Sequence, residues 1–329
     1  MKSNRKVLDI TCIIPSTCSA EILPYLQKCI NSLIHTAEEE VRIKILVVSS
    51  NPQGREKLLS QKIDNFYLVD KSLGFAEMNN VAIEESLGFY NADYYLLVND
   101  DVWVEKDFFS VLYEFFQKNK ADIVCPLICR QDGSIDSYGI EYFTSGFSQN
   151  ANHEQIETTL AAAACVIIKS KLLKKIRDKY GFYFNPLLHS YYEDTDFSLR
   201  ARAVGAYIVK NVNLKVHHIG SFSYGENSPQ VMYYTFRNLL WVIFLTWPGY
   251  YILKNLWRIF LVQLWFVYCS IRDGCWWIYP KIFADTLYHG VLLNQYRSRT
   301  IPVYNESFNF SDVFSPFWFR TRLQGIAFN

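Results

Sequence analysis

Apolar runs and amphipathic stretches alternate through the first two thirds of the chain, and their periods predict its elements. Short runs of bulky apolar residues predict strands at residues 7–15, 41–49, 66–69, 94–98, 122–125, 160–168, 207–209 and 214–216. Apolar residues at helical spacing predict helices at residues 20–36, 75–88 and 107–119, and a fourth that opens at the acidic residues 193–196. Strands that alternate with helices in this way predict an α/β fold with a wound, mainly parallel sheet and right-handed crossovers.

The run at residues 94–98 stops abruptly at Asn99, Asp100 and Asp101. Its side chains are bulky on both faces, which is typical of a strand buried on both sides of a parallel sheet. Such sheets bind ligands at the carboxyl ends of their strands. Adjacent carboxylates repel each other unless a cation neutralises them, and their oxygens suit Mg²⁺ or Mn²⁺ carrying a diphosphate. A turn or cap for the helix that begins near Asp107 is the alternative.

Two further polar clusters follow later in the chain. Glu193, Asp194 and Asp196 lie in the first turn of a predicted helix, where the helix dipole favours ionised carboxylates. An ionised carboxylate at that place suits a general base for a hydroxyl group, and N-capping by solvent-facing acids is the alternative. His217 and His218 follow the last predicted strand, where an imidazole either binds a divalent cation or lies unpartnered at the surface.

The start of the predicted helix at residues 75–88 is a candidate anion site. Its first backbone N–H groups lack helical partners, and Gly74 would allow a ligand to approach closely. A glycine-mediated junction between a loop and a helix is the alternative.

Three segments between the clusters carry weaker signals. Residues 130–134 contain Asp-Gly and predict a hairpin tip. The polar residues 146–159 predict a mobile loop over a site. The alanines within residues 160–168 either leave space for a sugar or pack against a helix.

The last hundred residues differ in composition from the rest. Residues 230–329 carry nine Lys/Arg, four Asp/Glu and seven of the eight Trp. Two apolar stretches, at residues 239–253 and 256–271, are separated by a Pro-Gly pair, and each is shorter than the roughly 20 residues that span a membrane. Trp and basic residues at their ends predict helices in the plane of a membrane surface. A tilted or re-entrant span and a buried helical subdomain or dimer contact are the alternatives.

We therefore predict a wound domain at residues 1–229 and a membrane-associating helical region at residues 230–329. The eight Cys form neither a CxxC pair nor a short secreted framework, which predicts reduced, mostly buried thiols in a cytosolic protein. Residues 1–9 are charged and leave no room for the apolar core of a signal peptide. Nucleic-acid binding has no support, because the basic residues lie among apolar helices and the wound domain is net acidic.

In their order along the chain, these clusters resemble family 2 glycosyltransferases of the GT-A fold, and among them the bacterial rhamnosyltransferase-like branch. The resemblance covers about residues 8–225 and is carried by IIPST, GFAEMNN, LLVNDDV, YYEDTDFSLRARAVG and VHHIGSFS. It implies a nucleotide-binding set made of Pro15, Ser16, Ser49, Gly74, Phe75, Ala76, Asn79, Asn80, Asn99 and Asp100.

The same resemblance implies the residues of the chemistry. Asp101 takes the place of the metal-binding last residue of the DxD-type motif, and His218 takes that of a metal-ligating His, with His217 as the alternative. Asp194, beside Glu193, takes the place of the base in the ED motif.

Two positions depart from the family pattern. Asn99 stands at the first acidic position of the DxD-type motif, and Ser49 stands where many members have an Asp that contacts the base of the nucleotide. The implied reaction is an inverting, Mg²⁺- or Mn²⁺-dependent sugar transfer in cell-surface polysaccharide synthesis. The expected donor is dTDP-rhamnose, and the expected acceptor is a lipid-linked or growing glycan at the cytosolic face of the membrane.

Several alternatives to this function stay open. A UDP-hexose or UDP-galactofuranose donor fits the same motifs, a homo-oligomer is compatible with them, and a non-catalytic GT-A scaffold is the alternative from another class. A nucleotidyltransferase would need a glycine-rich, basic phosphate loop after the first strand, which residues 16–20 do not provide.

Overall fold

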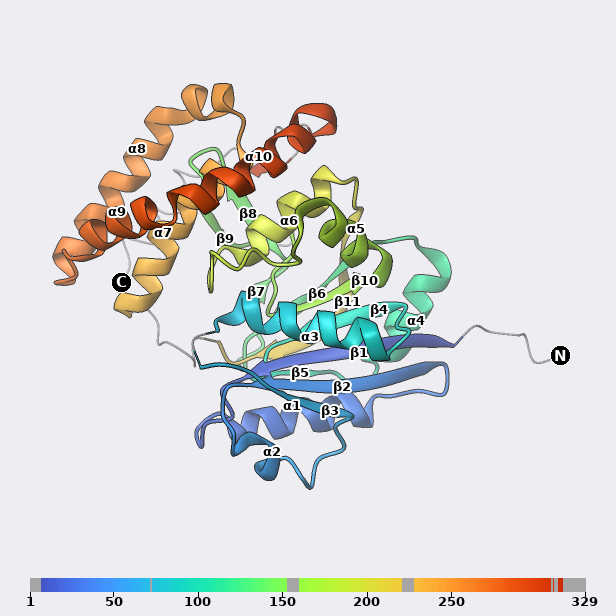
Figure 1. Cartoon of the computed structure of the whole chain (residues 1–329). Helices are drawn as coiled ribbons and strands as arrows, with labels where there is room; N and C mark the ends of the chain where they lie inside the picture. The colour runs from blue at the N-terminus through green and yellow to red at the C-terminus, as the bar shows by residue number, and fades with distance from the viewer. Residues whose placement is uncertain are drawn as a thin grey trace.

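The computed structural model describes residues 7–71, 73–152, 160–220, 228–308, 310 and 313–315. Within these residues the centre is a nine-stranded sheet of order β3-β2-β1-β4-β10-β6-β11-β5, with β7 paired to β6 (Figure 1). The strands are β1 Leu8–Ser16, β2 Val41–Ser49, β3 Asn65–Leu68, β4 Tyr94–Val98, β5 Val102–Val104, β6 Ile123–Cys129, β7 Ile135–Ser137, β10 Cys165–Lys169 and β11 Ile208–His218. β5, β7 and β10 run antiparallel to their neighbours and the others share one direction, which confirms a mainly parallel sheet.

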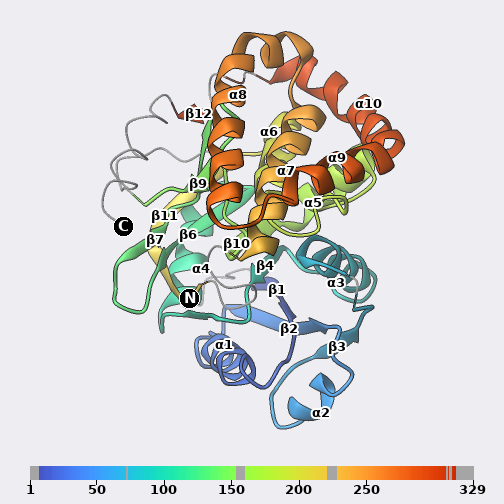
Figure 2. The same cartoon turned by 90° about the vertical axis from the view of Figure 1, so that its left-hand side faces the viewer.

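Helices cover both faces of this sheet, with α1 and α4 on one side and α3 and α5 on the other (Figure 2). The helices of this part are α1 Leu23–His35, α2 Gly54–Lys57, α3 Phe75–Phe89, α4 Phe108–Lys118, α5 Ser170–Tyr180 and α6 Glu193–Ala203. The buried residues of α1 recur at helical spacing and form its core-facing stripe: Leu26, Cys29, Ile30 and Leu33. The four helices predicted from the periodicity are confirmed.

The parallel register brings the carboxyl ends of β1, β2 and β4 to one edge. Ser16 pairs with Ser49, and Ile13 pairs with Leu97 two residues before Asn99. The polar residues that follow β4 therefore lie beside the ends of β1 and β2, as expected for a wound sheet.

The strand predicted at residues 160–168 begins only at Cys165. β10 runs antiparallel between β4 and β6. Before it, the backbone N–H of Ala161 donates to Ser198 Oγ of α6 at 3.0 Å. The small side chains thus allow α6 to approach the backbone, which confirms the alternative that the alanines pack against a helix.

The other boundary differences lie around the histidines and the hairpin. The strands predicted at residues 207–209 and 214–216 form one strand, β11, which begins at Ile208 and has a register shift between Asn211 and Lys215. His217 and His218 are therefore the last residues of a strand rather than the loop after it. The predicted hairpin tip is confirmed, since Arg130 N–H donates to Ser134 O and Gly133 has φ +82°.

The prediction of a mobile loop at residues 146–159 is wrong for residues 148–150, which form a strand. β8 Ile140–Phe143, β9 Ser148–Asn150 and β12 Phe314–Ser315 form a second sheet. Gly146, at φ +79°, turns between β8 and β9, and a Cβ there would collide with Ile243 of the later helix α7 Pro229–Thr246. The rest of that prediction, at residues 153–159, lies outside the described residues.

Four more helices follow: α7 Pro229–Thr246, α8 Gly249–Arg272, α9 Ile278–Tyr288 and α10 Gly290–Ser307. Leu239, Val242 and Trp247 are fully buried and belong to the same hydrophobic cluster as the sheet. Residues of α7 therefore pack in the same core as the sheet, and the division into domains at residue 229 stays a prediction.

The predicted break at the Pro-Gly pair is confirmed, but the expected helix lengths are wrong. The break divides the apolar stretch at residues 239–253, and α8 extends over 24 residues. Of the helices in the described residues, α8 alone is long and apolar enough to cross a membrane, with a mean hydropathy of 1.2 over 18 residues. Figure 1 shows α8 at the periphery of the molecule, outside α7.

Candidate active site

The turn between β4 and β5 and the end of β11 bring Asp101 and His218 together. Asp101 Oδ1 lies 3.3 Å from His218 Nε2, and Asp101 Oδ2 accepts the backbone N–H of Gly220 at 3.1 Å. Both side chains are largely buried. The structure therefore places the two predicted metal ligands in direct contact, although they are 117 residues apart in the sequence.

A third residue, Asp136 of β7, was not predicted. Its Oδ2 lies 3.1 Å from His218 Nδ1, and its Oδ1 pairs with Arg130 at 3.0 Å. Burial alone would lower the pKa of His218, but the bonds to Asp101 and Asp136 raise it to about 9. A single Asp in the arm of a hairpin carries no signal in the sequence that links it to a histidine 82 residues away.

The donor set of this corner fits a divalent cation. Asp101 offers a carboxylate and His218 an Nε2 whose ring is oriented through Nδ1 by Asp136, as is usual for metal-bound histidines. Mg²⁺ is commonly held by one or two carboxylates, with the phosphates of a substrate and water as its other ligands. Within the described residues no group of three or more His, Cys, Asp or Glu forms a complete site. Ligands from a bound diphosphate would be needed to complete it.

Asn99 and Asp100 directly precede Asp101 in the chain. We call Asn99, Asp100, Asp101 and His218 together the acidic corner. Burial raises the pKa of Asp100 to about 7, although a hydrogen bond with Ser16 acts in the opposite direction. Asn99 Oδ1 is buried and has no hydrogen-bond partner among the described residues. Ser16 and Ser49 are buried at the ends of β1 and β2, and Pro15 precedes Ser16 in the same strand.

Asp194 lies in the first turn of α6, next to the acidic corner. Its Oδ2 faces the backbone N–H of Ala163 at 3.5 Å, and the following residue, Ala164, accepts the N–H of Asn99 at 2.9 Å. Burial raises the pKa of Asp194 to about 6, despite hydrogen bonds from Thr195 N–H and Ala163 N–H. Asp194 is therefore ionised at neutral pH but more basic than an ordinary carboxylate, which suits a general base.

The two other acids of this turn have different surroundings. Glu193 is buried, and its Oε2 has no hydrogen-bond partner in the part of the chain that the structure describes. Burial and the neighbouring Asp194 raise its pKa well above the ordinary value. Asp196 is buried against Arg200, with an N–O distance of 2.7 Å. These acids are not solvent-facing caps. Asp196 is a structural ion-pair partner, whereas Asp194 retains partial exposure.

The prediction of an open anion site at the start of α3 is wrong. The Phe75 N–H faces Ser190 Oγ at 3.4 Å, and the Ala76 N–H donates to His189 O at 2.9 Å. The Gly74 N–H donates to Glu77 Oε2 at 3.1 Å. A Cβ on Gly74 would lie 2.5 Å from the His189 ring, so this glycine admits a neighbouring loop and not a ligand.

Asn79 and Asn80 are also bonded within the protein. Asn80 donates to Phe184 O and accepts from Phe184 N–H, at 2.7 and 2.8 Å. Asn79 is fully buried and donates to Phe75 O of its own helix. The Asn80 amide thus holds α3 and the segment before α6 together, whereas the Asn79 amide bonds within α3. Contact of either residue with a nucleotide stays a prediction.

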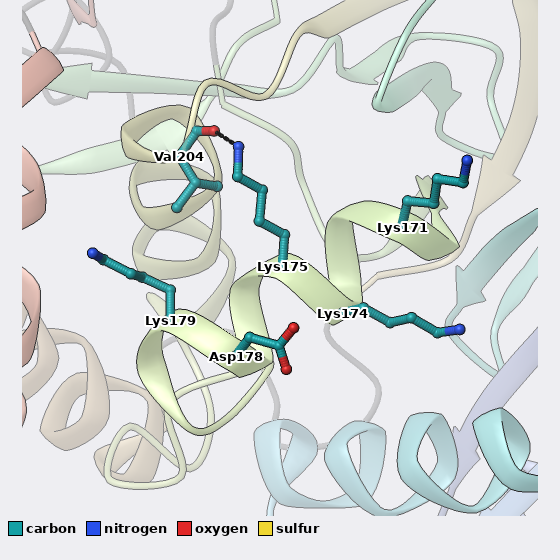
Figure 3. Close-up of a pocket in the computed structure, with 6 residues that line it drawn as sticks. All are labelled: Lys171, Lys174, Lys175, Asp178, Lys179 and Val204. Atoms are coloured by element: carbon teal, nitrogen blue, oxygen red, sulfur yellow. Dashed lines mark hydrogen bonds between the residues drawn. The ribbon is translucent and has the colours of Figure 1, made fainter.

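A hollow on the surface lies away from these residues. It has a volume of about 530 Å³ and is lined by Lys171, Lys174, Lys175, Asp178 and Lys179 of α5 and by Val204, which follows α6 (Figure 3). Lys175 donates to Val204 O, and the other lysines point into solvent along the exposed side of α5. None of the predicted site residues lines it.

Comparison with known proteins identifies the family. The model of glycosyl transferase family 2 matches residues 11–177, which is half of the chain. The chain belongs to glycosyl transferase family 2. The matched region contains the acidic corner residues Asp100 and Asp101 but ends before Asp194 and His218.

The chain is similar to several known proteins and covers part of each. It is 22% identical over 209 residues to the low-salt glycan biosynthesis hexosyltransferase Agl10 of Haloferax volcanii, over 58% of this chain and 66% of that protein. The structure of GalNAc-T7 with UDP, GalNAc and Mn²⁺ matches with a TM-score of 0.55 at 14% identity, over 73% of this chain and 49% of that one. S. aureus TarS matches with a TM-score of 0.49 at 19% identity, over 72% and 40%.

This chain therefore spans less than two thirds of each of these proteins. The likeness to GalNAc-T7 and the family membership show a GT-A-like fold, as predicted. They do not test the roles of the individual residues. In the predicted VHHIGSFS motif, residues 221–223 lie outside the described residues.

Proposed function

We propose that this family 2 member is an inverting, metal-dependent glycosyltransferase that moves a sugar from a nucleotide-diphosphate donor to a hydroxyl group. The observation that supports this most directly is the position of Asp194. Its carboxylate faces Ala163 N–H, and Ala164 bonds to Asn99 at the acidic corner. A candidate base thus lies beside the residues that would hold the donor's diphosphate.

The reaction follows from these side chains. Asp194 accepts the proton of the acceptor hydroxyl while that oxygen forms a bond to the anomeric carbon. The bond between this carbon and the diphosphate oxygen breaks, and its electron pair leaves with the nucleoside diphosphate. Attack opposite to the leaving group inverts the anomeric configuration. A divalent cation held by Asp101 and His218 would supply electrostatic stabilisation of the leaving diphosphate.

The donor that we propose is dTDP-rhamnose, and the alternatives are a UDP-hexose or UDP-galactofuranose. The order of the motifs, which resembles that of rhamnosyltransferases, supports dTDP-rhamnose. The hexosyltransferase name of the Agl10 relative supports a hexose. Ser49 is buried at the end of β2, at the position where many family members have an Asp that contacts the nucleobase. Its hydroxyl group does not distinguish uracil from thymine.

We further propose that the enzyme works at the cytosolic face of a membrane on a lipid-linked or growing glycan. Large apolar side chains are exposed along α8: Tyr250, Leu253, Leu256, Trp257, Phe260, Leu261, Leu264, Tyr268 and Ile271. Exposed apolar surface of this extent marks an interaction site. Trp and Tyr among these residues, with Lys254, Arg258 and Arg272 on the same helix, suit the headgroup region of an anionic bilayer.

The packing of α8 supports an in-plane position over a span. One stripe of α8 is buried in the protein: Asn255, Ile259, Val262, Phe266 and Ser270. Phe266 stacks on Phe236 of α7 with ring centroids 3.9 Å apart. A helix packed in this way against the protein core can insert only its opposite face into a bilayer.

A thermal-shift panel tests the proposed function. The purified protein is heated with dTDP-rhamnose, UDP-glucose, UDP-galactose, UDP-galactofuranose or GDP-mannose, each with Mn²⁺, Mg²⁺ or EDTA. Because a ligand that binds the native state raises the melting temperature, one donor should stabilise the protein only with metal. That donor then enters a transfer assay, in which NMR of the product reports the anomeric configuration.

The outcomes separate the alternatives. Metal-dependent stabilisation by one donor and an inverted product would support the proposal and name the nucleotide. A product with retained configuration would refute Asp194 as a simple base. Folded protein that no donor stabilises would favour the non-catalytic scaffold.

A further inference from the structure

The loop at residues 187–192, which leads into α6, has an unfavourable backbone. His189, Tyr191 and Tyr192 have φ values of +63°, +65° and +67°. Residues with side chains rarely adopt this left-handed conformation, and it persists where the surroundings enforce it. Tyr192 is the last residue before α6, and Asp194 is the second residue of that helix.

Two adjacent residues of α7 hold this loop. Asn238 Nδ2 lies 2.7 to 2.8 Å from the carbonyl oxygens of Leu188, Ser190 and Tyr191. Arg237 Nη2 donates to Leu188 O at 3.1 Å and to a second loop carbonyl, that of residue 187, at 3.0 Å. Five contacts from α7 therefore reach the backbone of one short loop.

The orientation of the Asn238 amide is itself fixed. Arg237 Nε donates to Asn238 Oδ1 at 2.9 Å, which leaves Nδ2 directed at the loop. Asn238 is fully buried, so water does not replace its donors. Its three carbonyl partners include one on each side of the left-handed His189 and that of the left-handed Tyr191.

The other side of the loop is bonded to α3. Ala76 N–H donates to His189 O, and Phe75 N–H faces Ser190 Oγ. The loop is thus held between α3 and α7 on both sides. The Tyr191 carbonyl is bonded to Asn238, and the Tyr192 hydroxyl accepts the backbone N–H of Ser148 at 3.1 Å.

We propose that Asn238 is a positioning residue for the catalytic base: by holding the 187–192 loop in its left-handed conformation, it sets the direction in which α6 begins and so the place of Asp194. This proposal rests on the proposed function. Without the donors of Asn238, Tyr191 and Tyr192 relax toward ordinary φ values. The first turn of α6 then shifts, and Asp194 leaves its place beside Ala163.

The test compares Asn238→Ala with a matched control, Asn255→Ala. Asn255 is also a buried asparagine, but its Nδ2 donates to Tyr251 O of its own helix α8. For Asn238→Ala we expect kcat to fall about 100-fold, because a displacement of about 1 Å can cost that much. The Kd for the nucleoside diphosphate with metal should stay within about twofold of wild type, because the acidic corner is untouched. For the control, Asn255→Ala, kcat and the Kd for the nucleoside diphosphate should both stay within about threefold of wild type.

Hydrogen exchange measured by mass spectrometry gives a readout that does not depend on activity. In the wild type, the amides of Leu188 and Ser190, which donate to Asn185 O and Leu188 O, should be protected. In Asn238→Ala, exchange should accelerate there and stay unchanged in β1 and β4. If Asn238→Ala does not fold, Arg237→Lys replaces it, since lysine keeps the charge but cannot bond to both carbonyls and to Asn238 together.

Three results would overturn the proposal. They are wild-type kcat in Asn238→Ala, equal losses of kcat and of nucleotide affinity, and rapid exchange of the Leu188 and Ser190 amides in the wild type. Failure of the proposed function would look different, because the wild type itself would then transfer no sugar, while the exchange measurement would still report on the loop.

Discussion

Asp194→Asn should abolish transfer and at the same time make the protein more stable. Burial raises the pKa of Asp194 from an ordinary 3.8 to about 6, so its ionised form is disfavoured in the folded state. That difference corresponds to about 3 kcal/mol at pH 7. Asparagine keeps the Oδ1 that accepts Thr195 N–H at 2.7 Å but loses the acceptor that faces Ala163 N–H at 3.5 Å, which costs about 1 kcal/mol.

The net gain is therefore about 2 kcal/mol at pH 7, or about 3 °C in Tm for a chain of this length. The sign with pH follows from the raised pKa. As the pH falls through 6, the folded wild type takes up a proton that the unfolded chain still lacks, so the wild type gains stability relative to the variant. Because the lost hydrogen bond costs about 1 kcal/mol at either pH, the Tm advantage of Asp194→Asn should be full at pH 8 and about one third as large at pH 5.

The assay is scanning fluorimetry at pH 8 and pH 5, with transfer and nucleotide binding measured on the same samples. Asp196→Asn is the comparison in the same helical turn. It leaves the buried Arg200 without its partner and should lower stability by about 3 to 5 kcal/mol. A less stable Asp194→Asn protein, or one that transfers sugar at the wild-type rate, would refute the reasoning.

Three further predictions concern the site and the membrane. The acid limb of the kcat/KM profile should fall with slope one through a pKa near 6, because Asp194 acts when ionised, and a limb near pH 4 would contradict this. Asp136→Asn should weaken Mn²⁺ binding, measured by electron paramagnetic resonance, about 10- to 100-fold, because His218 loses the partner that orients it; unchanged affinity would remove that role. Joint substitution of Phe260 and Leu264 by Glu should release the protein from anionic vesicles in a flotation assay without lowering nucleotide affinity, and continued flotation would place the membrane contact elsewhere.

Local patterns in the sequence were sufficient to predict the wound sheet and the acidic corner. The strand at residues 94–98 and the three polar residues after it have a distinct composition, and the parallel register then brings them to the ends of β1 and β2. Buried parallel strands carry such a signal because both of their faces are apolar. The contact between Asp101 and His218 follows from the same logic, since each ends an element at one edge of the sheet.

The features that were missed depend on contacts between distant segments. No local pattern shows that His189 and Ser190 occupy the first N–H groups of α3, more than 110 residues away, and so the predicted anion site failed. The sequence around Asp136 and around Asn238 contains no recognisable motif. Only the fold brings Asp136 to His218 and Asn238 to the loop before α6.

The integration of α7 changes how the membrane region must be studied. Trp247 is fully buried and its indole N–H donates to Tyr142 of the second sheet, while Asn238 holds the loop that leads to Asp194. Removal of residues 230–329 would therefore take away core side chains together with the exposed face of α8. A truncated protein that fails to bind membranes would report unfolding as readily as loss of an anchor. Substitutions confined to the exposed face of α8 separate the two effects, because its buried stripe, which includes Phe266, continues to pack on α7.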